Sequence, residues 1–129
     1  MSAAVPRGYA LNRTRQVYLA TQLHVAQTHW SRFRGLMWTE AGSFVAGQGL
    51  WIVPSRGVHT FAMRFPIDVI YLDGGNTVIY AEENLKPWRV APVRMSAASV
   101  LELPGSTLSA TRTAVGDAIE IALQEAGRA

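Results

Sequence analysis

Short runs rich in β-branched and aromatic residues recur along this chain at intervals of roughly ten residues, and turn-forming residues separate them. The clearest case is the stretch IDVIYLDGGNTVIYAE, residues 67–82, in which Asp73–Asn76 joins two apolar runs. A short glycine-containing link between two such runs is typical of a β-hairpin. The repeated spacing indicates a single-domain, mostly β fold, either a sandwich or a barrel.

One amphipathic helix is predicted over residues 27–37. Trp30, Phe33 and Met37 recur there at helical spacing, Thr28 is a suitable N-cap, and Gly35 lies near the end. We expect the three apolar side chains to pack against a sheet or to cover its edge. The remaining predicted elements are one helical turn over residues 106–110 and strands over residues 16–23, 49–53, 59–63, 67–72, 77–82, 98–103 and 118–123.

The length of 129 residues suits one domain with a sizeable core. We predict an irregular tail over residues 1–14 and a single β-rich domain over residues 15–129. A composition of 49% hydrophobic and 16% charged residues is that of a globular protein. The absence of cysteine excludes disulfides, thiolate metal sites and cysteine nucleophiles.

The first twenty residues contain Arg7, Arg13 and Arg15, which interrupt any compact apolar stretch of the kind found in secretory signals. The longest uncharged runs, residues 16–31 and 41–55, are too short and too polar to cross a bilayer. We therefore expect a cytoplasmic protein without a transmembrane segment, and a leader removed from this chain stays an open alternative.

The net charge is +3, and the charges are unevenly distributed: residues 1–64 hold seven arginines and one acid, Glu40. Such asymmetry indicates either an anionic partner or pairing between the two halves of the fold. Nucleic-acid binding usually shows clustered basic residues interleaved with aromatic ones. The arginines here are scattered singly, so no nucleic-acid partner is predicted.

Residues 58–73, VHTFAMRFPIDVIYLD, carry an acid in apolar surroundings. On a strand, Asp68 shares one face with Ile70 and Leu72. An ionised carboxylate on such a face is costly unless it is paired. We hypothesise that Asp68 specifies the fold through a cationic or amide partner, and a site carboxylate is the alternative. The nearest candidates for that partner in the sequence are Arg32, Arg34 and Arg64.

His59 would lie beside Phe61 and Met63, where a lone histidine is more often a satisfied core or rim residue than a ligand. No pair of closely spaced histidines and no dense acidic cluster indicates a metal, so neither a metal nor another cofactor is predicted. No serine lies in a nucleophile motif, and no glycine-rich loop is followed by a phosphate-binding lysine.

Several segments occur in the order seen in one bacterial and archaeal family. They are RGLM (34–37), GLWI (49–52), HTFAMRFPIDVIYLD (59–73), Pro87–Trp88, VLELPG (100–105) and VGD (115–117). Over residues 14–123 the chain resembles the family catalogued as domain of unknown function 192. The resemblance implies a jelly-roll-type sandwich with a short helix near the start, and no established activity. The matching positions are Gly35, Leu36, Met37, Phe61, Met63, Pro66, Asp68, Glu102, Gly116 and Asp117.

Two classes of function follow as hypotheses. The first is a non-enzymatic accessory domain that binds a small ligand or a protein partner in a groove on the sheet face. Its expected lining residues are His59, Arg64, Trp51 and Arg34. The second is a small hydrolase or lyase that uses the carboxylates of Asp68 and Glu102 with His59. We favour the first, because no catalytic spacing is visible. The sequence leaves the ligand and the oligomeric state open.

Overall fold

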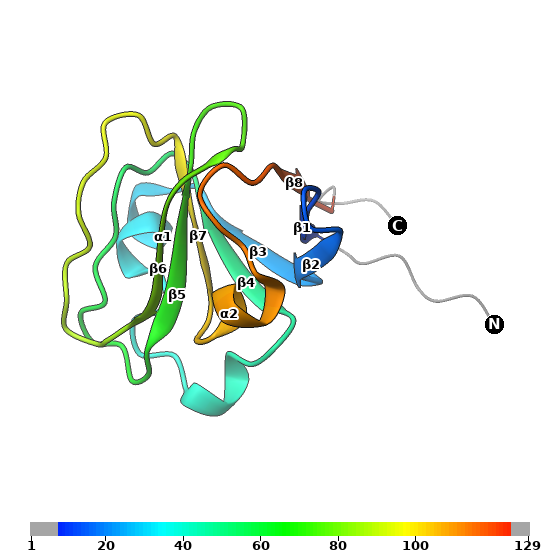
Figure 1. Cartoon of the computed structure of the whole chain (residues 1–129). Coiled ribbons are helices and arrows are strands. Elements are labelled where there is room, and N and C mark those ends of the chain that lie inside the picture. Colours follow the sequence, from blue (N-terminus) through cyan, green and yellow to red (C-terminus); the bar gives the residue numbers. More distant parts are fainter. Residues whose placement is uncertain (1–7, 125–129) are drawn as a thin grey trace.

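The computed structural model describes residues 8–124, which fold as two packed sheets with short helices (Figure 1). The smaller sheet has three antiparallel strands in the order β2-β1-β8. The larger sheet has five strands in the order β3-β4-β7-β5-β6, and within it only the pair β3–β4 is parallel. The mostly β, single-domain fold predicted from the strand spacing is confirmed, and of the two predicted arrangements the two separate sheets match the sandwich.

The strands of the smaller sheet are β1 (Tyr9–Asn12), β2 (Val17–Ala20) and β8 (Ile119–Ala122). Those of the larger sheet are β3 (Gln22–Ala26), β4 (Gln48–Ile52), β5 (Ile67–Leu72), β6 (Val78–Leu85) and β7 (Ser99–Pro104). The helices are α1 (His29–Arg34), α2 (Thr107–Thr111) and a 3₁₀ turn, η1 (Ala41–Ser43). No helix within residues 8–124 is both long enough and apolar enough to span a membrane.

Both faces of the five-stranded sheet are covered. Since successive side chains along each strand point to opposite faces, each face has its own cluster of packed residues. On one face, Ile70, Leu101 and Leu103 pack against Leu19 of the smaller sheet and Leu108 of α2. On the other face, the residues of β5 and β7 meet the segments that follow α1 and β4. That second cluster comprises Leu36, Phe44, Met63, Ile67, Val69, Tyr71, Leu85, Ala91, Ala97 and Val100. In Figure 1, α1 and the smaller sheet lie on opposite sides of the large sheet.

Helix α1 begins where its capping residue predicts. The Thr28 hydroxyl accepts a hydrogen bond from the Ser31 N–H at 3.0 Å, and the Ser31 hydroxyl accepts one from the Thr28 N–H at 3.0 Å. The prediction that Trp30 and Phe33 pack against the sheet is wrong, since they are 60% and 55% exposed. The helix ends at Gly35, so only the residues beyond that turn, including Met37, reach the core.

The strand predicted over residues 59–63 is also wrong. Thr60 is fully buried and ties this segment to a distant loop: its N–H donates to the Arg89 carbonyl at 2.8 Å and its hydroxyl to the Lys86 carbonyl at 2.6 Å. Ala62 then takes a positive φ of 57°, which ends any extended run. A single bridge between His59 and Val90 is all the pairing that the segment makes.

Two further predictions need correction near the start of the described residues. Residues 9–12 form β1 instead of belonging to an irregular tail, and residues 1–7 lie outside the part that the structure describes. The strand predicted over residues 16–23 is divided into β2 and β3, because the N–H groups of Thr21 and Gln22 both turn to the Gly47 carbonyl at 2.9 Å. The remaining strands and the hairpin at residues 73–76 are confirmed.

Candidate functional site

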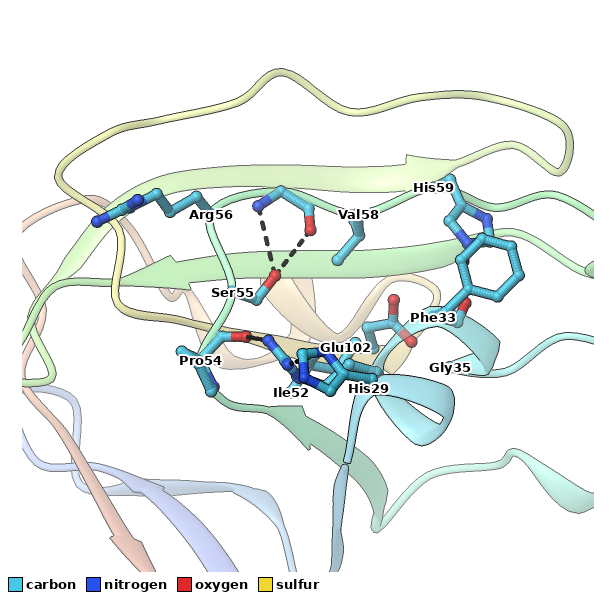
Figure 2. A pocket seen from close by; sticks show the side chains of 12 residues that line it. His29, Phe33, Gly35, Ile52, Pro54, Ser55, Arg56, Val58, His59 and Glu102 are labelled. Carbon is cyan, nitrogen blue, oxygen red and sulfur yellow. Dashed lines mark hydrogen bonds between the residues drawn. The ribbon is translucent and has the colours of Figure 1, made fainter. Parts of the chain in front are cut away.

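A pocket of about 380 Å³ opens on the outer face of the large sheet, between α1, the end of β4 and the segment that follows it. Figure 2 shows the Glu102 carboxyl, carried by β7, lying beneath the segment that holds Val58 and beside Phe33 and Gly35. The lining residues are His29, Arg32, Phe33, Gly35, Ile52, Pro54, Ser55, Arg56, Gly57, Val58, His59 and Glu102.

Glu102 is the central polar group of this pocket. β7 lies between β4 and β5, and this places Glu102 opposite Leu50 and Val69 in the middle of the sheet. The residue is 1% exposed, and its Oε1 atom has no hydrogen-bond partner among the described residues. Burial in these surroundings raises the pKa of Glu102 to about 8, because the charged form loses its hydration. A carboxyl with this pKa is mainly protonated at pH 7.

Gly35 leaves space beside that carboxyl. Its φ of 48° and ψ of −123° form a backbone conformation that L side chains rarely adopt. A Cβ atom at this position would lie 3.5 Å from Oε1 and 3.9 Å from Oε2 of Glu102. Glycine therefore serves both the turn that ends α1 and the close approach of backbone to acid.

Arg32 is the second residue of the pocket that has a polar side-chain atom without a hydrogen-bond partner. Its Nη1 donates to the Pro54 carbonyl at 3.0 Å, and its Nη2 contacts Nδ1 of His29 at 3.0 Å. The Nε atom is buried and has no partner among residues 8–124. The guanidinium is thus fixed in position, and one of its N–H groups has no hydrogen-bond partner among the described residues.

The His59 ring is held by two backbone groups. Nδ1 lies 3.1 Å from the Phe61 nitrogen and Nε2 lies 2.8 Å from the Phe33 carbonyl oxygen. Because a backbone N–H only donates and a carbonyl only accepts, Nδ1 must be the acceptor and Nε2 must carry the proton. His59 therefore links α1 to the following loop, and neither ring nitrogen is left to take a proton from a substrate.

Asp68 lies on the opposite side of the sheet from the pocket. Its Oδ1 accepts from the N–H groups of Asn84 at 2.8 Å and Ser106 at 3.0 Å, and its Oδ2 accepts from Leu108 at 2.7 Å. The arginine candidates are wrong, and backbone amide N–H groups, the other predicted kind of partner, satisfy the carboxylate. Desolvation raises the pKa of Asp68, and these three bonds oppose that shift. The proposed catalytic group of Asp68, Glu102 and His59 is thus not assembled.

Of the four side chains predicted to line a groove, the structure places only His59 in this pocket. Arg64 forms an exposed ion pair with Glu40 at 2.7 Å. Trp51 points to the other face of the sheet and packs against the core between the sheets. Arg34 lines a different depression, on the far side of Gly35.

Sequence reasoning missed Arg32 and His29 as pocket residues, although their spacing of three on a helix places them on one face. It named Glu102 as a catalytic candidate and missed its burial. The available signal was the acid in VLELP, a polar residue inside an apolar run on a central strand. Within residues 8–124 no three histidine or acidic side chains converge as metal ligands would.

Five rings form a continuous aromatic row beside the pocket: Trp30, Phe33, His59, Phe61 and Trp88. Neighbouring ring centroids along the row are 6.1, 5.1, 4.9 and 6.1 Å apart. Trp30 and Trp88, at its two ends, are 60% and 64% exposed. Val90 and Val93, which line one depression together with His59 and Phe61, extend this exposed apolar surface. Contiguous exposed apolar area of this kind commonly marks a binding surface.

Residues 10–121 match the family described as DUF192, Uncharacterized ACR. A UPF0127 protein from Thermococcus sibiricus is 28% identical over 120 residues, which cover 89% of this chain and 75% of that protein. A UPF0127 protein from Pyrococcus abyssi is 28% identical over 118 residues, covering 88% of this chain and 97% of that protein.

Two solved structures share the fold. A protein of unknown function from Novosphingobium aromaticivorans superposes with a TM-score of 0.70 at 20% identity, over 88% of this chain and 82% of that one. A protein from Sinorhizobium meliloti, described as a candidate transcription regulator, superposes with a TM-score of 0.76 at 23% identity, over 94% of this chain and 96% of that one. At these identities the likeness concerns the fold alone.

Proposed function

The chain belongs to the DUF192 family of uncharacterised proteins, and we propose that this domain binds a small polar molecule in the pocket floored by Glu102. One observation carries the proposal: a carboxyl buried in the centre of a sheet faces a pocket and has an oxygen without a hydrogen-bond partner. Buried polar groups in folded proteins are nearly always hydrogen-bonded, so an exception at a pocket points to a missing partner.

The geometry supports binding over the alternative of a hydrolase or lyase. Proton-transfer chemistry needs a second titratable group within hydrogen-bond reach of the reacting centre. Asp68 is on the wrong face of the sheet, and both ring nitrogens of His59 are engaged by backbone. Glu102 is left as a lone acid, a group suited to holding a ligand.

A screen tests this proposal. Purified protein is heated with a panel of metabolites, sugars and anions, and the same panel is applied to Glu102→Leu, whose apolar side chain fits among Leu50 and Val69. A ligand present at 100 times its Kd stabilises the native state by about 2.7 kcal/mol. We expect at least one compound to raise the Tm of the parent and not of the variant. Equal shifts in both proteins, or none in either, would reject the proposal.

The aromatic row favours a second candidate, the docking of an acidic, apolar segment of a protein partner. The segments that carry the row and its surroundings, residues 28–64 and 86–95, contain six arginines and Lys86 against one acid, Glu40. Such a surface complements a partner of negative charge. The specific observation is the exposure of Trp88 and Phe61 together with the exposed Val90 and Val93.

An array of synthetic peptides separates this candidate from the first. We expect bound peptides to combine acidic and aromatic or aliphatic residues, and to be lost in the double variant Phe61→Ser, Trp88→Ser. Glu102→Gln, which leaves the row untouched, should bind the same peptides unchanged. Binding that survives loss of both rings, or that shows no preference for acidic peptides, would exclude the row as the docking surface.

A further inference from the structure

The pocket holds two buried polar atoms that lack partners: Oε1 of Glu102 and Nε of Arg32. They come from elements far apart in sequence, β7 and α1, which the fold brings to one cavity. Each buried polar atom without a partner needs an explanation, and one ligand in this cavity would explain both. What each atom offers therefore restricts the chemistry of that partner.

Arg32 offers only a donor. A guanidinium has N–H groups and no acceptor, and both Nη groups are already used by the Pro54 carbonyl and the His29 ring. The ligand must therefore present an acceptor to Nε. A charged donor also forms stronger bonds with an anionic acceptor than with a neutral one.

The charges around Glu102 determine what it offers. Arg32 and His29 from α1 and Arg56 and His59 from the segment after β4 line the same pocket, and the strands on either side contribute Leu50 and Val69. The Arg56 side chain points away from Glu102 (Figure 2). No other acid lines the pocket. A cationic ligand would be repelled by the guanidinium of Arg32, which the Pro54 carbonyl and the His29 ring hold in the pocket. A protonated Glu102 can donate its O–H to an anion without repulsion, so both unpartnered groups act as donors toward the same ligand.

The walls favour an organic molecule over a purely inorganic ion. Ile52, Phe33 and Val58 give the pocket an apolar side, and its volume of about 380 Å³ exceeds by several-fold that of a small oxyanion. A molecule that fills this space presents acceptor oxygens at one end and hydrocarbon at the other. Two donors match the two oxygens of a carboxylate.

We infer that the pocket binds a small organic carboxylate, held by the O–H of Glu102 and the Nε–H of Arg32. This inference rests on the proposed function. Three probes that share one ring and differ in the head group test this: benzoate, benzamide and benzylammonium. Isothermal titration calorimetry at pH 7 should show benzoate binding at least about tenfold more tightly than the other two.

The pH dependence gives an independent readout. If benzoate binds only the protonated acid, ionisation of a group with a pKa of about 8 weakens binding about tenfold between pH 7 and pH 9. Glu102→Gln keeps a neutral donor and should bind benzoate with little change over this range. The matched control, Glu40→Gln, alters an exposed carboxylate outside the pocket and should retain the tenfold loss of the parent.

The outcomes separate the two proposals. Tighter binding of benzamide or benzylammonium than of benzoate, lost in Glu102→Leu, overturns the carboxylate and leaves a binding pocket in place. Benzoate affinity that is the same at pH 7 and pH 9, or that falls equally in Glu102→Gln, overturns the role of Glu102 as donor. Absence of binding by all three probes also overturns the carboxylate, while the wider screen decides whether the pocket binds anything.

Discussion

Asp68 and Glu102 lie on adjacent strands of one sheet, and their carboxyls project from opposite faces. Asp68 is the cross-strand partner of Leu103, and Val69 is that of Glu102, so the alternation of side chains separates the two acids. Asp68 accepts three backbone N–H bonds near α2, whereas Glu102 lies at the pocket under α1. Backbone N–H groups satisfy one acid, and the other has an oxygen without a hydrogen-bond partner among the described residues.

Removing Asp68 should destabilise the fold. Asp68→Ala leaves the buried N–H of Leu108 and the part-buried N–H groups of Asn84 and Ser106 without their acceptor, and the expected loss is about 3–5 kcal/mol of unfolding free energy. Asp68→Asn retains one acceptor oxygen, which can keep the bonds from Asn84 and Ser106, so it should cost less. Denaturant unfolding of both variants measures the difference. A denaturation midpoint for Asp68→Ala equal to that of the parent would contradict the structural role.

Glu102 should make stability depend on pH. The pKa of Glu102 is raised in the folded state, so its favourable contribution is fully present below the unfolded pKa and is lost as the pH rises through about 8. The loss between these limits is on the order of 5 kcal/mol. Glu102→Gln cannot ionise, so its stability relative to the parent should grow from pH 5 to pH 8 and then level off. A difference that stays constant across pH 5–9 in urea unfolding would argue against a buried acid.

Gly35 should be sensitive to any side chain. Gly35→Ala places a Cβ in a strained backbone conformation, at an expected cost of about 1–3 kcal/mol. It also adds an atom beside Oε1 of Glu102, so ligand binding should weaken as well. Gly42→Ala is the control, because nothing lies within 4 Å of its added Cβ and its φ is not positive. Thermal unfolding of the pair should separate them, and equal Tm values would refute this assignment.

His59 should be a single neutral tautomer with the proton on Nε2. The N–H of Phe61 requires an acceptor at Nδ1, and the Phe33 carbonyl requires a donor at Nε2. Long-range ¹⁵N–¹H NMR spectra distinguish protonated from bare ring nitrogens. A spectrum with the proton on Nδ1, or with rapid exchange between both forms, would show that the ring is not held as described.

The predictability of the fold depended on whether an element's partners are local. The run of residues 67–72 was correctly predicted because its six residues are all buried and a short turn leads directly to the next strand. Residues 59–63 were wrongly predicted, since the bonds that shape them come from residues 86–89, far along the chain. The early end of α1 at Gly35 likewise reversed the expected burial of Trp30 and Phe33.

The candidate site could be predicted only in part for the same reason. Glu102 was visible as an acid within an apolar run, which indicates a special role for that position. Its lack of a partner depends on the register of β4 and β5 beside it, and no local pattern records that register. Arg32 enters the pocket because the carbonyl of Pro54, on another segment, holds one of its Nη groups.

The most direct measurement is the titration of the Glu102 carboxyl itself. Carbon-13 NMR of the side-chain carboxyl, assigned by its loss in Glu102→Gln, follows ionisation in the intact protein. A midpoint near pH 8 is predicted, moving higher when benzoate is added, because a bound anion favours the protonated acid. A midpoint close to the ordinary glutamate value of about 4.3 would contradict a neutral, unpartnered acid at the floor of the pocket.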